Sequence, residues 1–561
     1  MSSVPEISVQ NLDHLGLVAG LIDEIGIVEQ INQLVGEKPG EIVSPGHAVK
    51  AMILNGLGLV SAPLYLFSKF FEGKATEHLI GVGIQPEHLN DDRLGRVLDK
   101  LYLTGTSQIF TLVALAAAQK FEVSLDTVHL DSSSFHLHGE YESNLPEVYF
   151  SPKEVNSDKP DEPVSNPKTA PIPIRITYGY SRDHRPDLKQ FILDLICSGD
   201  GDVPLFLRVA SGNESDSASF AQIFREFKKQ LELDALMVAD SALYTAPNIE
   251  QMASLRWLCR VPLTISQAKQ LIEQLNSKEF VESTIAGYRW AAHTSNYGGV
   301  RQRWLVVESE SRRISDLRQL EKNITKAHQE AKKKLRELAA QEFACEPDAR
   351  TAANRLSKQL KYHNLTQIQI GPVLCESEAN SFSRAESSQQ VYKIQAQLEP
   401  DAGVIARQTL AAGRFILATN VLDIDQLSCD EMIAKYKEQQ SSERGFAFLK
   451  DPLFFTDSVF LKSPERIEAL ALVMGLCLLV YTLGQRYLRS QLQQSISTLK
   501  NQLGQPTINP TLRWIFQCFQ SVHFLRIATV KQISNLTQER LDILRFFPAS
   551  CRAYYLLPST S

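Results

Sequence analysis

Cysteine is scarce in this chain and never clustered, with eight cysteines spread over 561 residues. No two form a C-x-x-C pair, and none has a histidine at the spacing of a zinc site. The sequence therefore gives no sign of a zinc finger or a disulfide framework, and we expect reduced thiols in a cytosolic protein. The eight are Cys197, Cys259, Cys345, Cys375, Cys429, Cys477, Cys518 and Cys551.

The chain also lacks the segments that direct proteins to membranes. Its first residues, MSSVPEISVQNLDHLG, have neither the basic nor the apolar region of a secretory signal, so we expect a cytoplasmic protein. The most apolar stretch, Ala469–Leu483, is shorter than the roughly 20 residues that a spanning helix needs. We predict that this stretch forms a buried core helix.

An excess of positive charge is missing too, since the formal net charge is -6. Any surface for a nucleic acid must therefore come from local basic patches. The composition, with 43% hydrophobic and 22% charged residues, is that of a globular protein with a sizeable core. At 561 residues the chain is too long for one core, so we expect several domains.

Periodicity divides the chain into these domains. Residues 11 to about 120 have apolar positions every three or four residues, which predicts helices, whereas TVHLDSSSF alternates as a strand does. A long charged helix, SDLRQLEKNITKAHQEAKKKLRELAAQEF, and a hairpin before it interrupt the later pattern. We predict a helical N-terminal domain (1–122), a first core part (123–261), an insertion (262–405), a second core part (406–490) and a C-terminal segment (491–561).

The predicted core begins with three strands, a helix and a fourth strand. The runs KQFILDLIC and VPLFLRVAS are separated by SGDGD, which suits a tight reversal, and ALMVAD follows a helical segment. This β-β-β-α-β order is that of a ribonuclease-H-like mixed sheet, an α/β (α+β) fold. In such a sheet the first and fourth strands are neighbours, so Asp131 and Asp240 can meet at one edge.

Grouped carboxylates repel one another, and a divalent cation neutralises them. Oxygen ligands suit Mg²⁺, for which Mn²⁺ can substitute, and two such ions can activate a water or a 3′-hydroxyl in phosphoryl transfer. A third acid is needed from a helix that crosses the same edge. In YKEQQSSERGFAFLK, four residues fall within an arc of about 60° if the segment is one helix. They are Tyr436, Gln439, Glu443 and Lys450.

These residues resemble the DDE transposases of bacterial insertion sequences, in the branch marked by a tyrosine, arginine, glutamate, lysine signature. Tyr436, Glu443 and Lys450 are in register with that signature, and Gln439 takes the arginine position. LDSSSF, GYSRDHRPDLKQ, VADSALY, FILATN and ERGFAFLKDP extend the resemblance over most of the chain. The N-terminal stretch is similar to the uncharacterised helical domain that precedes the core in one subgroup.

The resemblance implies a transposase that cleaves DNA at terminal inverted repeats and joins the freed ends to target DNA. Asp131, Asp240 and Glu443 would be catalytic and would hold two Mg²⁺ ions. Tyr436 and Lys450 would contact DNA, and Gln439 would make a weaker contact because it carries no charge. Pairing of two DNA ends implies a homodimer on DNA, without a membrane partner.

Several of these residues also have structural interpretations. Asp131 and Asp240 could be turn residues at strand ends, and Asp126, Asp234 and Glu438 are the alternative acids. A basic cluster could bind phosphates or form salt bridges. It consists of Arg182, His184, Arg185 and Lys189. His136 and His138 lack further metal ligands, and Lys332–Lys334 resembles a solvated helix face more than a DNA groove.

Two other functions compete with transposition. One is a decayed or domesticated copy that binds DNA without turnover, and the other is a ribonuclease-H-like nuclease that cuts but does not join. The complete set of three acids argues against the first. Inverted repeats flanking the coding region would favour transposition over both.

Overall fold

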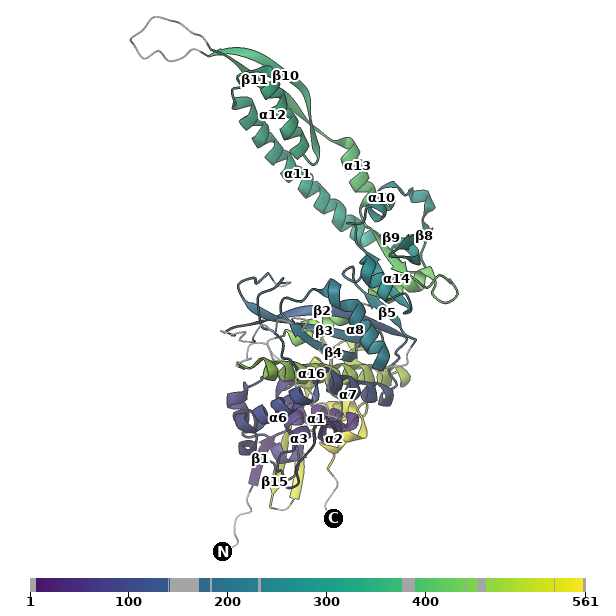
Figure 1. Cartoon of the computed structure of the whole chain (residues 1–561). Helices are drawn as coiled ribbons and strands as arrows, with labels where there is room; N and C mark the ends of the chain where they lie inside the picture. Colours follow the sequence, from purple (N-terminus) through teal and green to yellow (C-terminus); the bar gives the residue numbers. More distant parts are fainter. Residues whose placement is uncertain are drawn as a thin grey trace, which may run out of the picture. The chain divides into compact units, whose positions relative to one another are not determined.

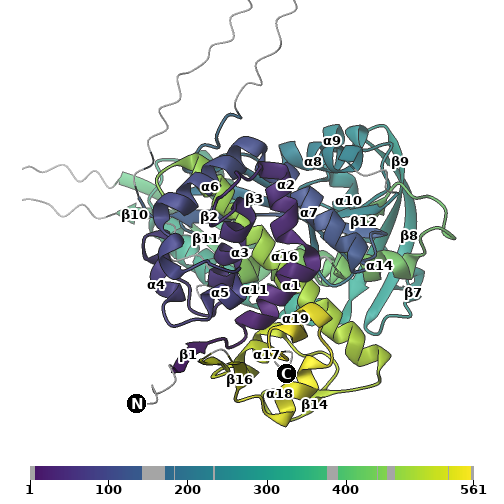
Figure 2. The same cartoon turned by 90° about the horizontal axis from the view of Figure 1, so that it is seen from below.

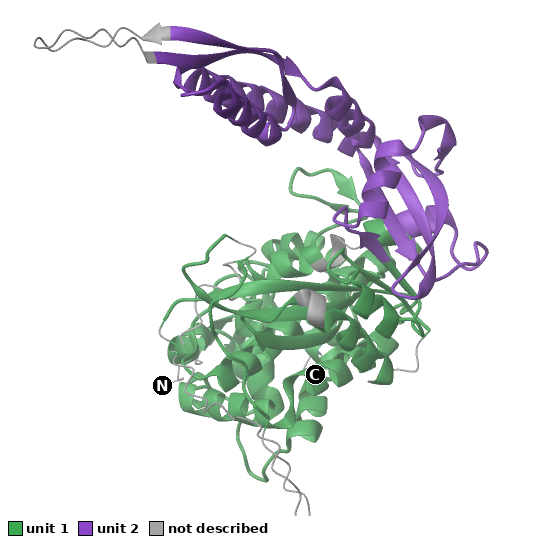
Figure 3. Cartoon of the chain, turned by 45° about the horizontal axis from the view of Figure 1, so that its top comes forward, with its two compact units in different colours: residues 1–258, 435–561 green, residues 259–434 purple. Residues whose placement is uncertain are grey.

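The computed structural model describes residues 7–557, apart from 140, 142–170, 182–183, 231–233, 376–388, 439, 452–460 and 529. These residues form two compact units (Figure 3). The first unit comprises residues 1–258 and 435–561, and the second comprises residues 259–434. All candidate catalytic residues belong to the first unit.

A mixed sheet forms the centre of the first unit. Its strands are hydrogen-bonded in the order β4-β3-β2-β5-β6. They are β2 (Thr127–Leu137), β3 (Lys189–Ser198), β4 (Pro204–Ser211), β5 (Leu236–Ala239) and β6 (Trp257–Val261), whose last three residues belong to the second unit. β2, β3 and β4 are antiparallel neighbours, whereas β2 and β5 run parallel. With α8 (Asp216–Gln230) between β4 and β5, the predicted β-β-β-α-β order and the ribonuclease-H-like mixed α/β fold are confirmed.

A long apolar helix, α16 (Pro464–Gln494), packs against this sheet (Figure 1). The Ser463 hydroxyl caps its first turn, and a proline occupies the first helical position. Gly475 permits a close approach, because a Cβ there would lie 2.3 Å from Leu207 of β4. By length and hydropathy α16 could span a membrane, but 89% of its apolar window is buried inside the protein, so the predicted core helix is confirmed.

The N-terminal region is mainly helical, as predicted, and one strand precedes its helices. The helices are α1 (Leu15–Ile25), α2 (Ile27–Val35), α3 (Pro45–Gly56), α4 (Phe67–Phe71), α5 (Thr76–Leu79), α6 (Asp91–Thr104) and α7 (Thr106–Lys120). The strand β1 (Ile7–Asn11) pairs with β15 (His523–Ile527) near the other end of the chain. β15 also pairs with β16 (Val530–Ser534).

The C-terminal segment packs on the N-terminal helices (Figure 2). α19 (Ala549–Ala553) lies against α1, and the Tyr555 hydroxyl after it donates a 2.6 Å hydrogen bond to the Asp13 carbonyl. The Lys50 ammonium is buried between Asp23 and Tyr554. The segment also contains α17 (Leu512–Cys518), α18 (Gln538–Leu544), and the short strands β13 (Leu499–Lys500) and β14 (Pro506–Thr507).

The second unit contains strands hydrogen-bonded in the order β12-β9-β8-β7. They are β7 (Val281–Glu282), β8 (Tyr288–Tyr297), β9 (Val300–Ser309) and β12 (Arg414–Thr419). The predicted hairpin is β8 and β9, and the strand expected in GRFILATN is β12, which pairs with β9. The unit therefore includes β12 as well as the segment expected to be an insertion.

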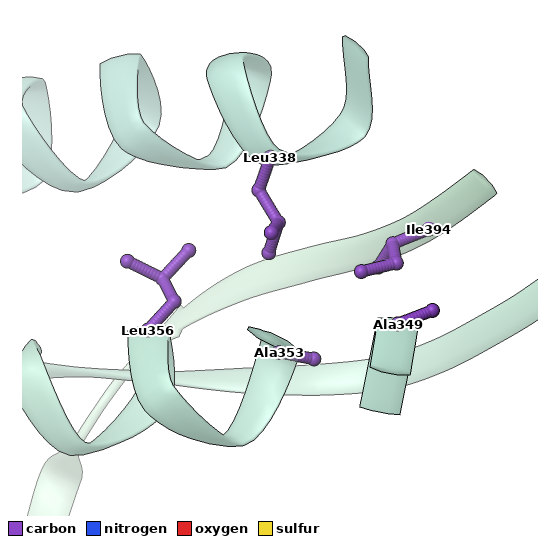
Figure 4. Close-up of a cluster of buried hydrophobic side chains, with 5 residues drawn as sticks. All are labelled: Leu338, Ala349, Ala353, Leu356 and Ile394. Atoms are coloured by element: carbon purple, nitrogen blue, oxygen red, sulfur yellow. The ribbon is translucent and has the colours of Figure 1, made fainter. Parts of the chain in front are cut away.

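An arm of the second unit is built on the predicted long charged helix, α11 (Glu310–Ala340). α11 packs with α12 (Glu346–Gln359) and with the hairpin of β10 (His363–Cys375) and β11 (Gln389–Pro400). Its core is thin and consists of Leu338, Ala349, Ala353, Leu356 and Ile394 (Figure 4). Also described are α9 (Ala246–Gln251) of the first unit, and α10 (Ser266–Gln274) and α13 (Ala402–Ala411) of the second.

Candidate active site

Asp131 and Asp240 lie side by side on neighbouring strands of the first unit. In the parallel pair of β2 and β5, Leu130 is opposite Ala239. Asp131 is the next residue of β2, and Asp240 comes directly after the end of β5. Neighbouring strands are about 4.8 Å apart, and residues in register project to the same face. The two half-buried carboxylates therefore lie on one face of the sheet, although 108 residues of chain stand between them in the sequence.

Each aspartate is oriented by a nearby backbone amide. The Ser132 amide donates a 2.8 Å hydrogen bond to Asp131, and the Ala242 amide donates a 2.8 Å bond to Asp240. The alternative acids Asp126 and Asp234 precede β2 and β5 and so lie at the opposite ends of these strands. Asp234 is exposed and forms an ion pair with Arg256 at 3.2 Å.

The chain segment that carries Glu443 runs along the face of β2 that bears Asp131. At one end, the Glu438 carboxylate lies 3.9 Å from the His129 ring nitrogen. At the other, the Lys450 ammonium lies 5.4 Å from the centre of the Phe135 ring. His129 and Phe135 are six positions apart on β2, or roughly 20 Å. Between these two contacts, α15 lies against β2 and β3. The segment therefore runs alongside β2, with Glu443 near its middle, at the level of Asp131.

Glu443 itself is exposed, in the first turn of α15 (Gln440–Leu449). Its neighbour Arg444 is held by two hydrogen bonds, of 2.8 and 3.0 Å, to Asp202 in the turn between β3 and β4. A Cβ on Gly445 would lie 3.9 Å from Leu195, the β3 residue paired with Asp131. These two contacts fix the start of α15 beside the sheet.

The prediction that one helix carries the four signature residues is wrong. Tyr436 belongs to α14 (Cys429–Lys437), Glu443 to α15, and Glu438 lies in a turn between them. The arc calculated for a single helix therefore does not apply to Tyr436. Lys450 does keep the helical register of Glu443, because its amide donates to the Phe446 carbonyl at 2.9 Å. Gln439 lies outside the described residues.

The donor chemistry of Asp131 and Asp240 fits a hard divalent cation, because both supply carboxylate oxygens on one face of the sheet. Within the described part of the chain, no three Asp, Glu, His or Cys side chains are close enough to hold a metal ion together. Glu443 therefore does not join the two aspartates as a third ligand in this conformation. Its side chain is exposed, in the first turn of a helix that lies beside the strand carrying Asp131.

A buried histidine beside the turn between α14 and α15 was not predicted. His129 is fully buried, and burial, with Lys435 nearby, lowers its pKa to about 4. Burial also raises the pKa of Glu438. The Lys435 ammonium donates a 2.6 Å hydrogen bond to the Thr127 hydroxyl, which ties the end of α14 to the start of β2. The feature of the sequence that could have indicated this residue is a histidine between two apolar residues near the start of the strand, in TVHL.

A polar network supports Asp131 from the opposite face of the sheet. The Ser132 hydroxyl donates to buried Asp194, and Arg208 donates to the same carboxylate at 2.8 Å. Burial raises the pKa of Asp194 despite the charge of Arg208, which also binds Glu214. The sequence could have indicated this network, because KQFILDLIC places an acid inside an apolar run and a buried carboxylate needs a partner.

Two members of the predicted basic cluster, Arg185 and Lys189, are engaged within the protein. Arg185 forms a two-bond ion pair with Asp187, at 3.0 and 2.9 Å, and the Lys189 ammonium donates to the Tyr141 carbonyl at 2.5 Å. The ring of His136 is hydrogen-bonded to Ser181 at 2.9 Å. Arg182 lies outside the described residues. The seven cysteines whose side chains are described form no disulfide.

Comparison with known families gives two matches. A family described as "Transposase DDE domain" matches residues 128–482, and one described as "Domain of unknown function (DUF4277)" matches residues 7–115. No curated protein matches the chain in sequence. Among solved structures, a piggyBac transposase synaptic complex with hairpin DNA is similar at 8% identity and a TM-score of 0.36. That alignment covers 99% of this chain and 85% of the other.

Proposed function

Because the chain belongs to the transposase DDE domain family, we propose that it catalyses cleavage and strand transfer at the ends of an insertion sequence. The observation that carries this proposal is the pairing of Asp131 with Asp240, combined with the passage of the Glu443 segment across the same face. It is the arrangement that phosphoryl transfer with divalent cations requires. In this proposal the protein is a bacterial member of the tyrosine, arginine, glutamate, lysine branch and acts in the cytoplasm.

In the proposed mechanism Asp131, Asp240 and Glu443 are the metal ligands. Two Mg²⁺ ions, for which Mn²⁺ can substitute, would supply an activated water or 3′-hydroxyl and stabilise the leaving oxygen. The protein contributes the placement of the ligands. The rigid sheet fixes Asp131 and Asp240, and Glu443 completes the set when metal and DNA are bound.

DNA would be bound beside these acids. Tyr436 and Lys450 flank Glu443 in the sequence, and we propose that they contact the strand near the cleaved phosphate. The Lys450 ammonium lies 5.4 Å from the centre of the Phe135 ring, on the face of β2 that bears Asp131. Gln439, Arg182, Arg185 and Lys189 complete the proposed contacts. The Arg185 ion pair with Asp187 is exposed and therefore worth little, so a phosphate can replace Asp187.

The test is Mg²⁺-dependent cleavage and joining of labelled DNA that carries the element's terminal inverted repeats. We expect the wild type to cut and join, and Glu443→Gln to lose at least about a hundredfold in rate while it retains DNA binding. Sizing with two bound ends should give a homodimer. A monomer with both ends bound would contradict that part of the proposal.

The competing functions predict different results in the same assay. Wild-type binding without any cutting would indicate a domesticated DNA-binding protein. Cutting of branched or duplex DNA without joining, and without preference for the terminal repeats, would indicate a nuclease. A Glu443→Gln variant as active as the wild type would remove Glu443 from the site and overturn the proposed set of three acids.

A further inference from the structure

Helix α11 in the arm of the second unit carries a row of cations along one face. With Arg318 set at zero and an advance of 100° per residue, Lys322, Lys326, Lys333 and Arg336 fall at about 40°, 80°, 60° and 0°. These five residues, which we call the α11 basic stripe, occupy a sector of about 80°. No Asp or Glu of α11 lies in this sector, since the nearest, Glu337 and Glu330, fall at about 100° and 120°.

The stripe is the face of α11 turned away from the core of the arm. The buried residues Leu320, Ala331 and Leu338 fall at about 200°, 220° and 200°, opposite the stripe. Leu338 points into the cluster with Ala353, Leu356 and Ile394 (Figure 4). The five cations therefore contribute little to the fold of the arm and can be changed without opening its core.

Internal pairing does not neutralise the stripe. All five side chains are exposed, and within the described residues four of them make no hydrogen bond or ion pair. The fifth, Lys333, lies 4.0 Å from Glu337, and both side chains are so exposed that the pair is worth little. A solvated helix face normally mixes both signs, whereas this sector holds cations and no carboxylate, and Glu337 and Glu330 lie about 20° and 40° beyond Lys326.

The geometry of the stripe matches a regular array of anions. From Arg318 to Arg336 the helix rises about 27 Å, which is the length of about eight base pairs of duplex DNA. The stripe includes no aromatic or large apolar side chain, so it lacks the groups that stack on bases or anchor protein interfaces. A membrane-binding helix would expose an apolar face beside its cations, but that face of α11 is buried in the arm.

We infer that the α11 basic stripe binds the phosphate backbone of duplex DNA, outside the active site. The inference rests on the proposed function, in that the duplex is the DNA on which the enzyme acts. Backbone contacts of this kind add affinity without sequence preference and hold the duplex in position. The arm would thus increase DNA affinity without contributing to the chemical step.

The test compares two triple variants that lose the same charge. The stripe variant is Lys322→Gln, Lys326→Gln, Lys333→Gln, and the control is Lys334→Gln, Arg355→Gln, Lys358→Gln, whose cations lie elsewhere on α11 and on α12. Glutamine and lysine have similar helix propensity, so both variants should fold. Binding of full-length protein to a labelled duplex is measured at several salt concentrations. We expect the slope of log affinity against log salt to fall by roughly 2 to 3 for the stripe variant, and by less than 1 for the control.

Two outcomes would overturn the inference. One is an equal slope for the two variants, whether or not it differs from that of the wild type. The other is an effect confined to single-stranded RNA or to phosphatidylserine vesicles. Cleavage at low salt with saturating protein separates this inference from the proposed function. If the wild type cleaves but the two variants have equal slopes, only the stripe fails. If the stripe variant has the lower slope but the wild type never cleaves, only the proposed function fails.

Discussion

Two charged regions of the molecule are supported by very different amounts of hydrophobic core. One is the face of the sheet that bears Asp131 and Asp240 in the first unit, and the other is the arm of the second unit. Asp131 and Asp240 follow strand residues that are fully buried, Leu130 and Ala239, in a sheet packed by helices. The α11 basic stripe stands on a core of five buried residues. Metal ligands must be placed to within a fraction of an ångström, whereas flexible lysines on a helix can follow a phosphate backbone. The difference indicates that chemistry needs a rigid support and that backbone binding does not.

The largest expected effect concerns the rigid region. Asp240→Asn should reduce metal-dependent cleavage by about a thousandfold, since a neutral amide is a poor ligand for Mg²⁺. The matched control is Asp234→Asn, at the other end of β5, which should leave the rate unchanged. Both variants are compared in single-turnover cleavage of pre-bound DNA. Equal rates for Asp240→Asn and the wild type would exclude the sheet edge as the catalytic centre.

A second comparison concerns the two cores. The Leu479 side chain of α16 is fully buried. Leu479→Ala should therefore lower the free energy of unfolding of the first unit by about 3 kcal/mol. Leu338→Ala, in the thin core of the arm, should cost about 2 kcal/mol and mainly increase local opening of α11 and α12. Urea unfolding measures the first effect, and amide hydrogen exchange locates the second. Loss of protection in the central sheet caused by Leu338→Ala would contradict the independence of the arm core.

A third change tests the packing of the C-terminal segment on the N-terminal helices. A Cβ on Gly20 would lie 2.3 Å from the Cα of Cys551, a backbone atom that cannot turn away. Gly20→Ala should therefore destabilise the protein by about 2 kcal/mol, although alanine is the better helix former. Gly371→Ala, which has open space around its Cβ, is the control in thermal unfolding. A stabilised Gly20→Ala variant would mean that α1 and α19 are not in contact.

The smallest expected effect is a dependence of stability on pH. Burial raises the pKa of Glu468 from 4.5 to about 6, against the effect of a 3.0 Å hydrogen bond from the Thr106 hydroxyl. Because the folded-state pKa is raised, the protonated Glu468 side chain favours the folded state. This stabilisation is fully present below pH 4.5 and is lost as pH rises through about 6. Glu468→Gln should flatten this loss and raise the free energy of unfolding at pH 7 by about 1 kcal/mol. Denaturant unfolding of the wild type and the variant at several pH values measures this difference. A variant whose stability depends on pH as the wild type does would show that Glu468 does not cause the loss.

Local patterns in the sequence predicted much of the first unit. The alternation in TVHLDSSSF and the apolar runs around SGDGD predicted β2, β3 and β4, because a strand buried on one or both faces has a fixed hydrophobic period. The apolar stretch within α16 was short enough to indicate a core helix. The acids Asp131 and Asp240 were placed at strand positions that the structure makes neighbours.

Other features could not be obtained from local patterns. The break between α14 and α15 has no proline or glycine to mark it, so a single helix was predicted where the chain turns at Glu438. The partners of buried polar groups, such as Asp194 with Arg208, depend on which strands become neighbours. The pairing of β1 with β15 joins opposite ends of the chain, and the sequence of neither strand identifies the other as its partner.

The sequence by itself determined the periods of the strands and helices, the order of the core elements and the positions of the acids within them. Only the tertiary structure decided the register in which β2 and β5 pair, the position of α15 beside Asp131, and the pairing of the N-terminal and C-terminal segments in one sheet. The physical reason is that periodicity is a property of a few adjacent residues. Pairing between distant segments is selected by the burial and hydrogen bonding of the whole chain.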